Sequence, residues 1–162
     1  MASDESRSAT FEDCSWPAVD RWSRLVVALL HSPQDCKNLE QWARVSGVAR
    51  GTLRTWCRTA RLPAARSLDF ARMLRAIHRS GLNGWRIDDV LDVVDARTYD
   101  RLLLRGGVSF LAKSNPITLH AFLGRQHYIV NARALESVER IVTTMTNDDS
   151  NDGVNAGTLR LL

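Results

Sequence analysis

Apolar residues recur at intervals of three and four positions through most of the chain between 18 and 105, the spacing that places them on one face of a helix. The pattern is interrupted at Pro33, Gly47, Pro63 and Gly106, residue types that end helices or form the turns between them. The sequence therefore predicts a series of short helices over 18–31, 39–46, 50–60, 64–79, 87–94 and 97–105.

Two of these helices form a pair separated by a tight turn. Asn38 is a favourable N-cap for the helix over 39–46, and Gly47 is the residue type that takes a left-handed C-cap without steric cost. In the helix over 50–60, apolar residues share one arc of the helical wheel and arginine and threonine lie outside it. The pattern predicts a helix-turn-helix unit.

The segment 64–79 is expected to link this unit to a second one. Its apolar residues recur at helical spacing, and its polar members are Arg66, Arg72, Arg75 and Arg79. The helices over 87–94 and 97–105 then repeat the order of short helix, turn and second helix. We expect an all-α fold in which two helix-turn-helix units are joined by a linking helix, over 18–115.

Beyond this domain the pattern predicts a flexible leader over 1–17, a C-terminal helical extension over 116–146 and a disordered tail over 147–162. Residues 108–111 fit a short helix or a strand. The most regular part of the extension is a helix over 131–145. Its apolar stripe either covers the domain's own core or pairs with a second copy in a homodimer.

Composition excludes several classes of protein. Hydrophobic residues make up 44% of the 162, and no apolar stretch approaches the ~20 residues needed to cross a bilayer, so no membrane span is expected. The acidic N-terminus lacks the features of a signal peptide, which predicts an intracellular, cytoplasmic protein. Cys14, Cys36 and Cys57 match neither a metal clip nor a disulfide framework and are interpreted as free thiols.

Positive charge is concentrated in the middle of the chain. The net charge is −3 over 1–19, +8 over 20–115 and −1 over 116–162. Between 36 and 86, Lys37 and ten arginines face only Glu40 and Asp69, which gives a net charge of +9. A local excess of this size indicates a polyanionic partner.

A short helix braced by a partner and carrying arginine and threonine on its outer face is suited to the DNA major groove. Glycine and threonine keep the face of 50–60 slim, and its arginines offer donors to phosphates or to guanine edges, a division that the sequence alone leaves open. The candidate DNA-binding residues are Arg44, Arg50, Gly51, Thr52, Arg54, Thr55, Arg58, Arg61, Arg97 and Arg101.

The residues of both units also carry a resemblance to a known family. Over roughly 20–115 the chain resembles the DNA-binding domain of AraC-type transcriptional regulators, in which two helix-turn-helix units flank one linking helix. The matching positions in the first half are Leu39, Ala43, Gly47, Val48, Leu53, Trp56, Cys57, Leu62, Pro63, Arg72 and Ala76. Those in the second half are Ile87, Val90, Leu91, Val94, Tyr99, Leu103, Gly107, Val108 and Ser109. The resemblance implies sequence-specific binding to double-stranded DNA and a role in transcription regulation.

The chain departs from the family pattern at several positions. The family usually has Ser at Ala49, Gly at Arg61 and a Gly-Phe pair at 95–96. It also has a proline and an aromatic-arginine pair where this chain has 110–113. The first unit is therefore the better candidate for base contacts, and whether the divergent second unit contacts DNA stays open.

Two other functions are weighed against DNA binding. A helical adaptor or anti-regulator would use the same basic face to bind an acidic partner protein. An enzyme is not predicted, because His31, His78, His120 and His127 lie in no catalytic or metal-binding motif. No cofactor is expected, and no small-molecule effector is predicted, because the 47 residues beyond 115 are too few for a separate ligand-sensing domain.

Overall fold

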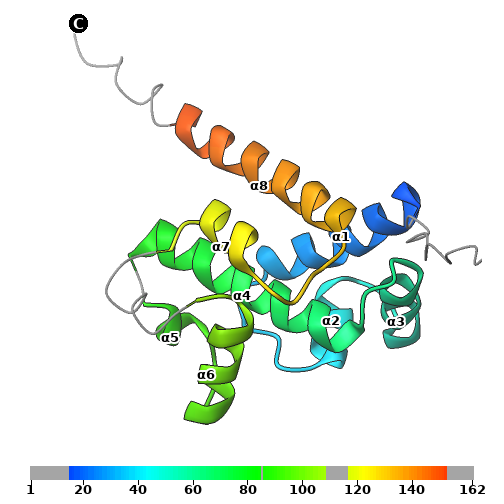
Figure 1. Ribbon diagram of the computed structural model, residues 1–162, viewed down its shortest axis with the longest axis horizontal. Coiled ribbons are helices and arrows are strands. Elements are labelled where there is room, and N and C mark those ends of the chain that lie inside the picture. The colour runs from blue at the N-terminus through cyan, green and yellow to red at the C-terminus, as the bar shows by residue number, and fades with distance from the viewer. Residues whose placement is uncertain (1–14, 85, 109–116, 153–162) are drawn as a thin grey trace, which may run out of the picture.

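The computed structural model describes residues 15–84, 86–108 and 117–152, the side chains of 148–152 excepted, and all regular structure in these ranges is helical (Figure 1). The all-α fold class predicted from the sequence is confirmed. The described helices are α1 Trp16–Leu30, α2 Leu39–Val45, α3 Arg50–Thr59, α4 Ala64–Asn83, α5 Ile87–Val90, α6 Ala96–Arg105, α7 Leu119–Arg125 and α8 Ala132–Asp152.

Helix α4 is the centre of the molecule. Helices α1, α2, α3, α5, α6 and α7 all pack against it, and in Figure 1 the pair α2–α3 lies toward one end of α4 and the pair α5–α6 toward the other. Phe70 of α4 stacks between Trp22 of α1 and Phe122 of α7, with ring centroids 6.0 and 5.9 Å apart. These three fully buried rings join helices from both halves of the chain into one apolar core.

The ends of α2 follow the sequence prediction. The Asn38 side chain accepts a hydrogen bond from the amide of Gln41 at 2.9 Å, which caps the helix. Gly47 takes a φ of +66° in the turn that follows, a conformation that glycine adopts without the steric penalty of a Cβ. The predicted cap and the predicted glycine turn are both confirmed, and they direct α3 away from α2.

Two helices, α4 and α5, end at other residues than predicted. Helix α4 continues four residues beyond the expected end at 79 and stops at Gly84, where φ is +66°. Helix α5 covers only 87–90 instead of 87–94, since Leu91 is extended and Val94 is 96% exposed. The helical spacing of the apolar residues was misleading here, because the backbone after Val90 turns to bond with the α1–α2 loop.

The C-terminal extension consists of two helices. The apolar stripe of α8 packs against α1 and α7 and buries Ala134, Val138 and Val142. This packing agrees with the first of the two alternatives that the sequence left open, in which the stripe covers the core of its own domain. In Figure 1 the C-terminal end of α8 extends away from the other helices.

Other predicted segments are only partly described. Helix α8 runs to Asp152, so the part of the expected disordered tail between 147 and 152 is helical, because no glycine or proline interrupts the chain before 153. Within the expected leader, α1 begins at Trp16 with proline in its first turn. The rest of the leader, residues 109–116 and the tail beyond 152 lie outside the described residues. Among the described helices, none combines the length and apolar character needed to cross a lipid bilayer.

Candidate nucleic-acid interface

Helix α3 is held by one apolar face. Leu53 and Cys57 are buried at 0% and 1% exposure, and Trp56 is half-buried against the same core. Helix α3 packs against α1, α2 and α4, which together cover this face. The opposite face, where the sequence places arginine and threonine, is open to solvent.

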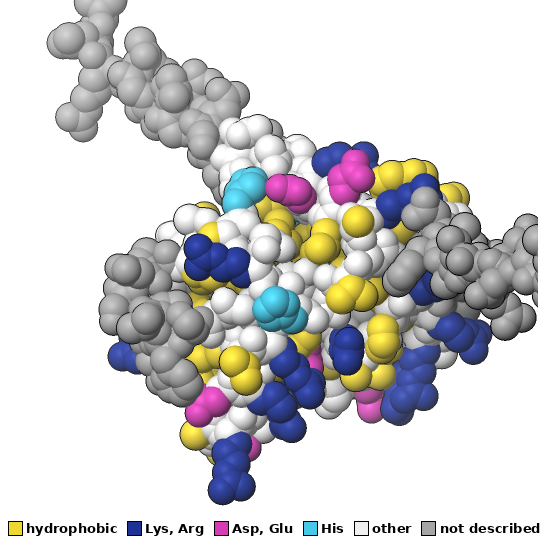
Figure 2. All heavy atoms as spheres, in the orientation of Figure 1, with side chains coloured by type: hydrophobic (Ala, Val, Ile, Leu, Met, Phe, Trp, Pro, Cys, Tyr) yellow, Lys and Arg dark blue, Asp and Glu magenta, His cyan; other side chains and the backbone are white. Residues whose placement is uncertain are grey.

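The predicted DNA-binding residues all lie at or near the surface. Nine of the ten are exposed, and Thr52 is half-buried. Figure 2 shows Lys and Arg side chains along the lower part of the molecule, over the regions of α3 and α6. Arg44 approaches Glu40 at 3.7 Å, but both side chains are more than 70% exposed, so this i,i+4 pair contributes little to stability. The arginines of α3 are therefore available to a partner.

Three arginines share one hollow at the turn between α3 and α4. This hollow, which we call the arginine hollow, has a volume of about 270 Å³ and is lined by Arg54, Arg58, Arg61, Leu62, Pro63 and Ala64. Its charged lining is therefore entirely cationic. Three guanidinium groups around one open space repel one another, and an anion in that space removes the repulsion.

The backbone at the arginine hollow is unusual. Arg61 has a φ of +56°, the one positive value at a non-glycine residue in the described part of the chain. An L-residue in the left-handed region is less stable than glycine by about 1–2 kcal/mol. Its amide and that of Leu62 bond to carbonyls of the last turn of α3, which fixes the turn despite this strain.

Helix α6 carries arginines at the same four-residue spacing as α3. Arg97, Arg101 and Arg105 on α6 correspond in spacing to the row formed by 50, 54 and 58 on α3. The rows differ in their surroundings, because Arg105 lies 3.9 Å from Asp69 of α4. An apolar residue, Leu104, lies next to Arg105 of the α6 row and is 75% exposed.

The acidic residues of the second pair are largely engaged within the protein. Asp95 caps α6, accepting bonds from the Thr98 hydroxyl at 2.9 Å and from two backbone amides. The Thr98 hydroxyl and the amides of Arg97 and Thr98 lower the pKa of Asp95. Asp88 accepts from Arg86 at 2.9 Å. Capping and pairing thus offset the negative charge that would otherwise oppose a polyanion on this side of the molecule.

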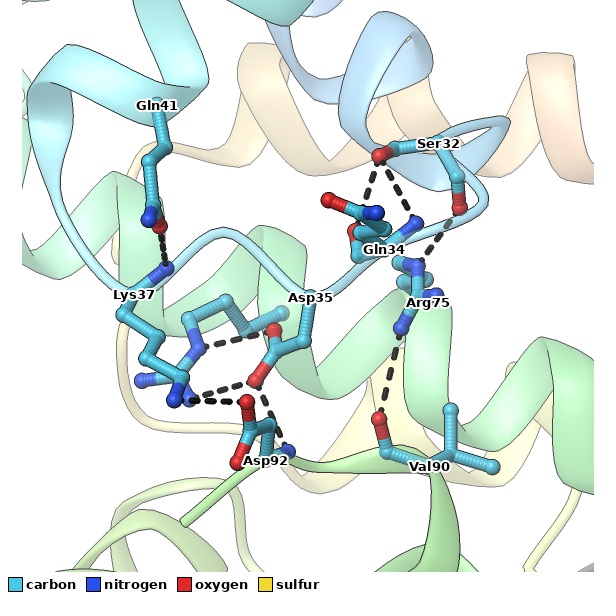
Figure 3. Close-up of polar contacts among 9 residues, drawn as sticks. Ser32, Gln34, Asp35, Lys37, Gln41, Arg75, Val90 and Asp92 are labelled. Atoms are coloured by element: carbon cyan, nitrogen blue, oxygen red, sulfur yellow. Dashed lines mark hydrogen bonds and ion pairs between the residues drawn. The ribbon is translucent and has the colours of Figure 1, made fainter.

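Two arginines of α4, which the sequence identifies as polar members of the linking helix, are buried. Arg72 and Arg75 are 6% and 2% exposed. Nε and one terminal nitrogen of Arg72 donate to the two oxygens of Asp35 at 3.0 and 2.6 Å. Arg75 donates to the carbonyls of Ser32 and Pro33 at 2.8 Å each, and Figure 3 shows it beside the loop that joins α1 to α2.

The burial of these two arginines has a physical reason. Residues on every side of the α4 helix are apolar through 70–77, and a helix that is apolar all round is buried. Burial lowers the pKa of Arg75, which is bonded only to neutral carbonyls. Burial acts in the same direction on Arg72, but its pairing with Asp35 outweighs that effect and raises the pKa of Arg72. Part of the positive charge excess between residues 36 and 86 thus lies inside the protein and not on its surface.

The described cysteines are inert thiols. Cys36 and Cys57 are free and buried, as the sequence predicted. Burial raises the pKa of Cys57 to about 11 and also raises that of Cys36. A protonated buried thiol is a poor nucleophile and a poor metal ligand.

Comparisons of this chain with protein-family models, with curated proteins and with solved structures yield no match.

Proposed function

We propose that this protein binds double-stranded DNA through the outer face of α3 and acts as a transcription regulator. The observation that carries the proposal is the combination of a buried apolar face with an exposed row formed by Arg50, Arg54 and Arg58 on a ten-residue helix. Such a helix has the size and surface that the major groove accepts. The order of helices α2–α3 and α5–α6 around α4 supports the AraC-like arrangement implied by the sequence.

The arginine hollow suggests how the α3 face divides its contacts. Arg54 and Arg58 line this space with no carboxylate among its lining residues, so we assign these two to backbone phosphates. Gly51 and Thr55 are exposed and small, and they allow α3 to approach base edges closely. Arg50 lines a different hollow, of about 460 Å³, together with Lys37 and Asp69.

A second candidate function is binding to an acidic partner protein through α6. Leu104 and Val94 are 75% and 96% exposed next to the α6 arginines. Exposed apolar residues among cations are more typical of a protein interface than of a phosphate contact. A homodimer through 131–145 is not part of either proposal, because that stripe covers the core.

The proposal is tested with the double variant Arg54→Ala/Arg58→Ala. We expect affinity for random-sequence duplexes to fall by about 10- to 100-fold, and the slope of log K against log salt to decrease by about one for each phosphate that is no longer neutralised. Fluorescence anisotropy at two salt concentrations measures both. The free energy of unfolding should stay within ~0.5 kcal/mol of the wild type, because both side chains are exposed.

A control is Arg125→Ala, which removes one arginine charge, half of what the double variant removes, from an exposed site on α7. It should leave the salt slope unchanged. If the double variant binds duplexes as the wild type does, or if the wild type binds none while capturing an acidic protein through α6, DNA binding by α3 is wrong.

A further inference from the structure

The loop between α1 and α2, residues 31–38, is fastened to the first helix pair. Its last residue, Asn38, caps α2, and the amide of Lys37 donates to the side-chain oxygen of Gln41 at 2.7 Å (Figure 3). Because α2 braces α3, the position of this loop is fixed relative to the α3 arginine row.

One carboxylate in this loop contacts both the central helix and the second helix pair. The side chain of Asp35 is 2% exposed and forms the paired hydrogen bonds with Arg72 of α4. Its Oδ2 atom also accepts a hydrogen bond from the backbone amide of Asp92 at 3.1 Å. Asp92 belongs to the short segment between α5 and α6. A single buried group therefore joins the α1–α2 loop, α4 and the start of the second unit.

Further contacts reinforce the same junction. Arg75 bonds to the Ser32 carbonyl and, at 3.4 Å, to the carbonyl of Val90 at the end of α5. The ammonium of Lys37 pairs with the Asp92 carboxylate at 2.5 Å, although both side chains are largely exposed. The junction is thus polar throughout, and Asp35 is its most buried carboxylate.

The two ends of α6 are held by different parts of the molecule. At the C-terminal end, the Tyr128 hydroxyl donates to the Leu102 carbonyl at 2.6 Å, and the His127 amide bonds to the Arg105 carbonyl at 2.9 Å. A Cβ at Gly107 would collide with the carbonyl oxygen of Arg125, so this end is closely packed. The N-terminal end follows directly from the segment that Asp35 holds. The Tyr99 hydroxyl of α6 donates to the Asp88 carboxylate of α5 at 3.4 Å, but α5 is a single turn and is too short to fix that end by itself.

We propose that Asp35 is a positioning residue that fixes the N-terminal end of α6 relative to α3, so that the two arginine rows form one surface of constant geometry. Without this contact, α6 would pivot about its C-terminal end, and Arg97 and Arg101 would lose their fixed orientation. The inference rests on the proposed function only in taking a nucleic acid as the partner of that surface; the geometry itself is testable without one.

Replacing Asp92 with proline removes the hydrogen bond from Asp92 to Asp35. The amide of Val93 bonds to the carbonyl of Leu91 at 2.9 Å, which makes Asp92 the centre of a γ-turn. Among the described non-glycine residues, a positive φ occurs at Arg61, so the φ of Asp92 is negative. The turn is therefore of the inverse type, in which the central residue has a φ of about −75°. Proline fits that φ, and Leu91 has the extended backbone that precedes proline. Asp92→Pro therefore deletes the amide donor without straining its own backbone, and the proline Cδ, which takes the place of the amide hydrogen, pushes the Asp35 carboxylate away from this segment.

The experiment measures distances between spin labels by pulsed electron resonance in the full chain. One label is attached at Thr55→Cys on α3 and the other at Ala96→Cys, at the start of α6; a second pair uses Leu104→Cys, near its end. All three positions are exposed. Cys14 is replaced by serine, and the parent protein without introduced cysteines reports any labelling of the buried native thiols.

We expect Asp92→Pro to broaden the 55–96 distance distribution by at least about twofold and to leave the 55–104 distribution narrow, as pivoting about one end requires. Asp92→Ala, which loses the pair with Lys37 but keeps the amide, should resemble the wild type. Asp35→Asn should resemble Asp92→Pro, and circular dichroism verifies that each variant is folded.

Two outcomes would overturn the proposal: an unchanged 55–96 distribution in Asp92→Pro, or equal broadening in Asp92→Ala. A simple loss of stability moves neither distribution in the folded molecules, so this readout is specific for positioning. The measurement contains no DNA, and its outcome therefore stands whether or not the proposed function is correct.

Discussion

The arginines of α3 and those of α4 have the same chemistry and opposite surroundings. Arg54 and Arg58 on α3 are exposed around a hollow whose charged lining is cationic, whereas Arg72 and Arg75 on α4 are almost fully buried. The difference arises from the position of each helix, because α3 lies at the edge of the molecule and α4 passes through its centre. Basic residues close together in a sequence therefore need not form one binding surface.

The two helices also use the guanidinium group in different ways. In α4 the planar fork bonds simultaneously to two oxygens of one carboxylate, an arrangement that requires fixed geometry. In α3 the same group is exposed to solvent. The first use bears on stability and, under the proposed function, the second bears on affinity, so substitutions should separate the two properties.

The largest expected effect comes from Arg72→Ala. Removing the guanidinium leaves the buried Asp35 carboxylate without its main partner, and breaking one side of a buried pair lowers the free energy of unfolding by about 3–5 kcal/mol. Urea unfolding monitored by circular dichroism measures the loss. Arg66→Ala, at an exposed position on the same helix, should change stability by less than ~0.5 kcal/mol. Similar values for the two variants would contradict the contrast between buried and exposed arginines.

An intermediate effect is expected when lysine replaces arginine. Lysine keeps the charge but lacks the fork, so Arg72→Lys should lose about 1–2 kcal/mol of stability even though its charge is unchanged. Arg58→Lys should retain both stability and the salt slope of duplex binding, because a point charge is sufficient for a phosphate. Unfolding and anisotropy titrations of both variants test the distinction. A stable Arg72→Lys variant would show that the paired geometry is unimportant.

The smallest effect concerns a carboxylate of the second pair, Asp95. Hydrogen bonds from the Thr98 hydroxyl and the amides of Arg97 and Thr98 hold its pKa below the ordinary value of 3.8. Because the folded-state pKa is lowered, the cap stabilises α6 above about pH 3.8 and loses this contribution as the pH falls through the folded-state pKa. The stability difference between the wild type and Asp95→Asn should shrink with acidification over that window. A pH-independent difference would contradict the assignment.

The sequence predicted the first helix pair in detail. Asn38 and Gly47 fix the ends of α2 by local chemistry, which needs no knowledge of distant contacts. The apolar arc through Leu53 and Cys57 gives the orientation of α3, and hence the exposure of its arginines, from periodicity alone. The part of the candidate site on α3 could be placed on the surface because its position depends on signals within the first helix pair itself.

The second pair and the buried arginines could not be predicted in this way. The burial of Arg72 depends on Asp35, which lies 37 residues earlier in the chain. The early end of α5 depends on the same carboxylate, which takes the amide of Asp92. The one local signal was the apolar composition on all sides of 70–77, which indicates a central helix and so a buried position for any arginine within it.

The turn after α3 bears on how this chain balances stability against affinity. A glycine at Arg61 would relieve the left-handed backbone but would remove one of the three cations around the hollow. If the arginine hollow holds phosphates as proposed, residue 61 is a position where ligand attraction and thermodynamic robustness compete, and libraries randomised at this codon should separate into tighter binders and more heat-resistant proteins.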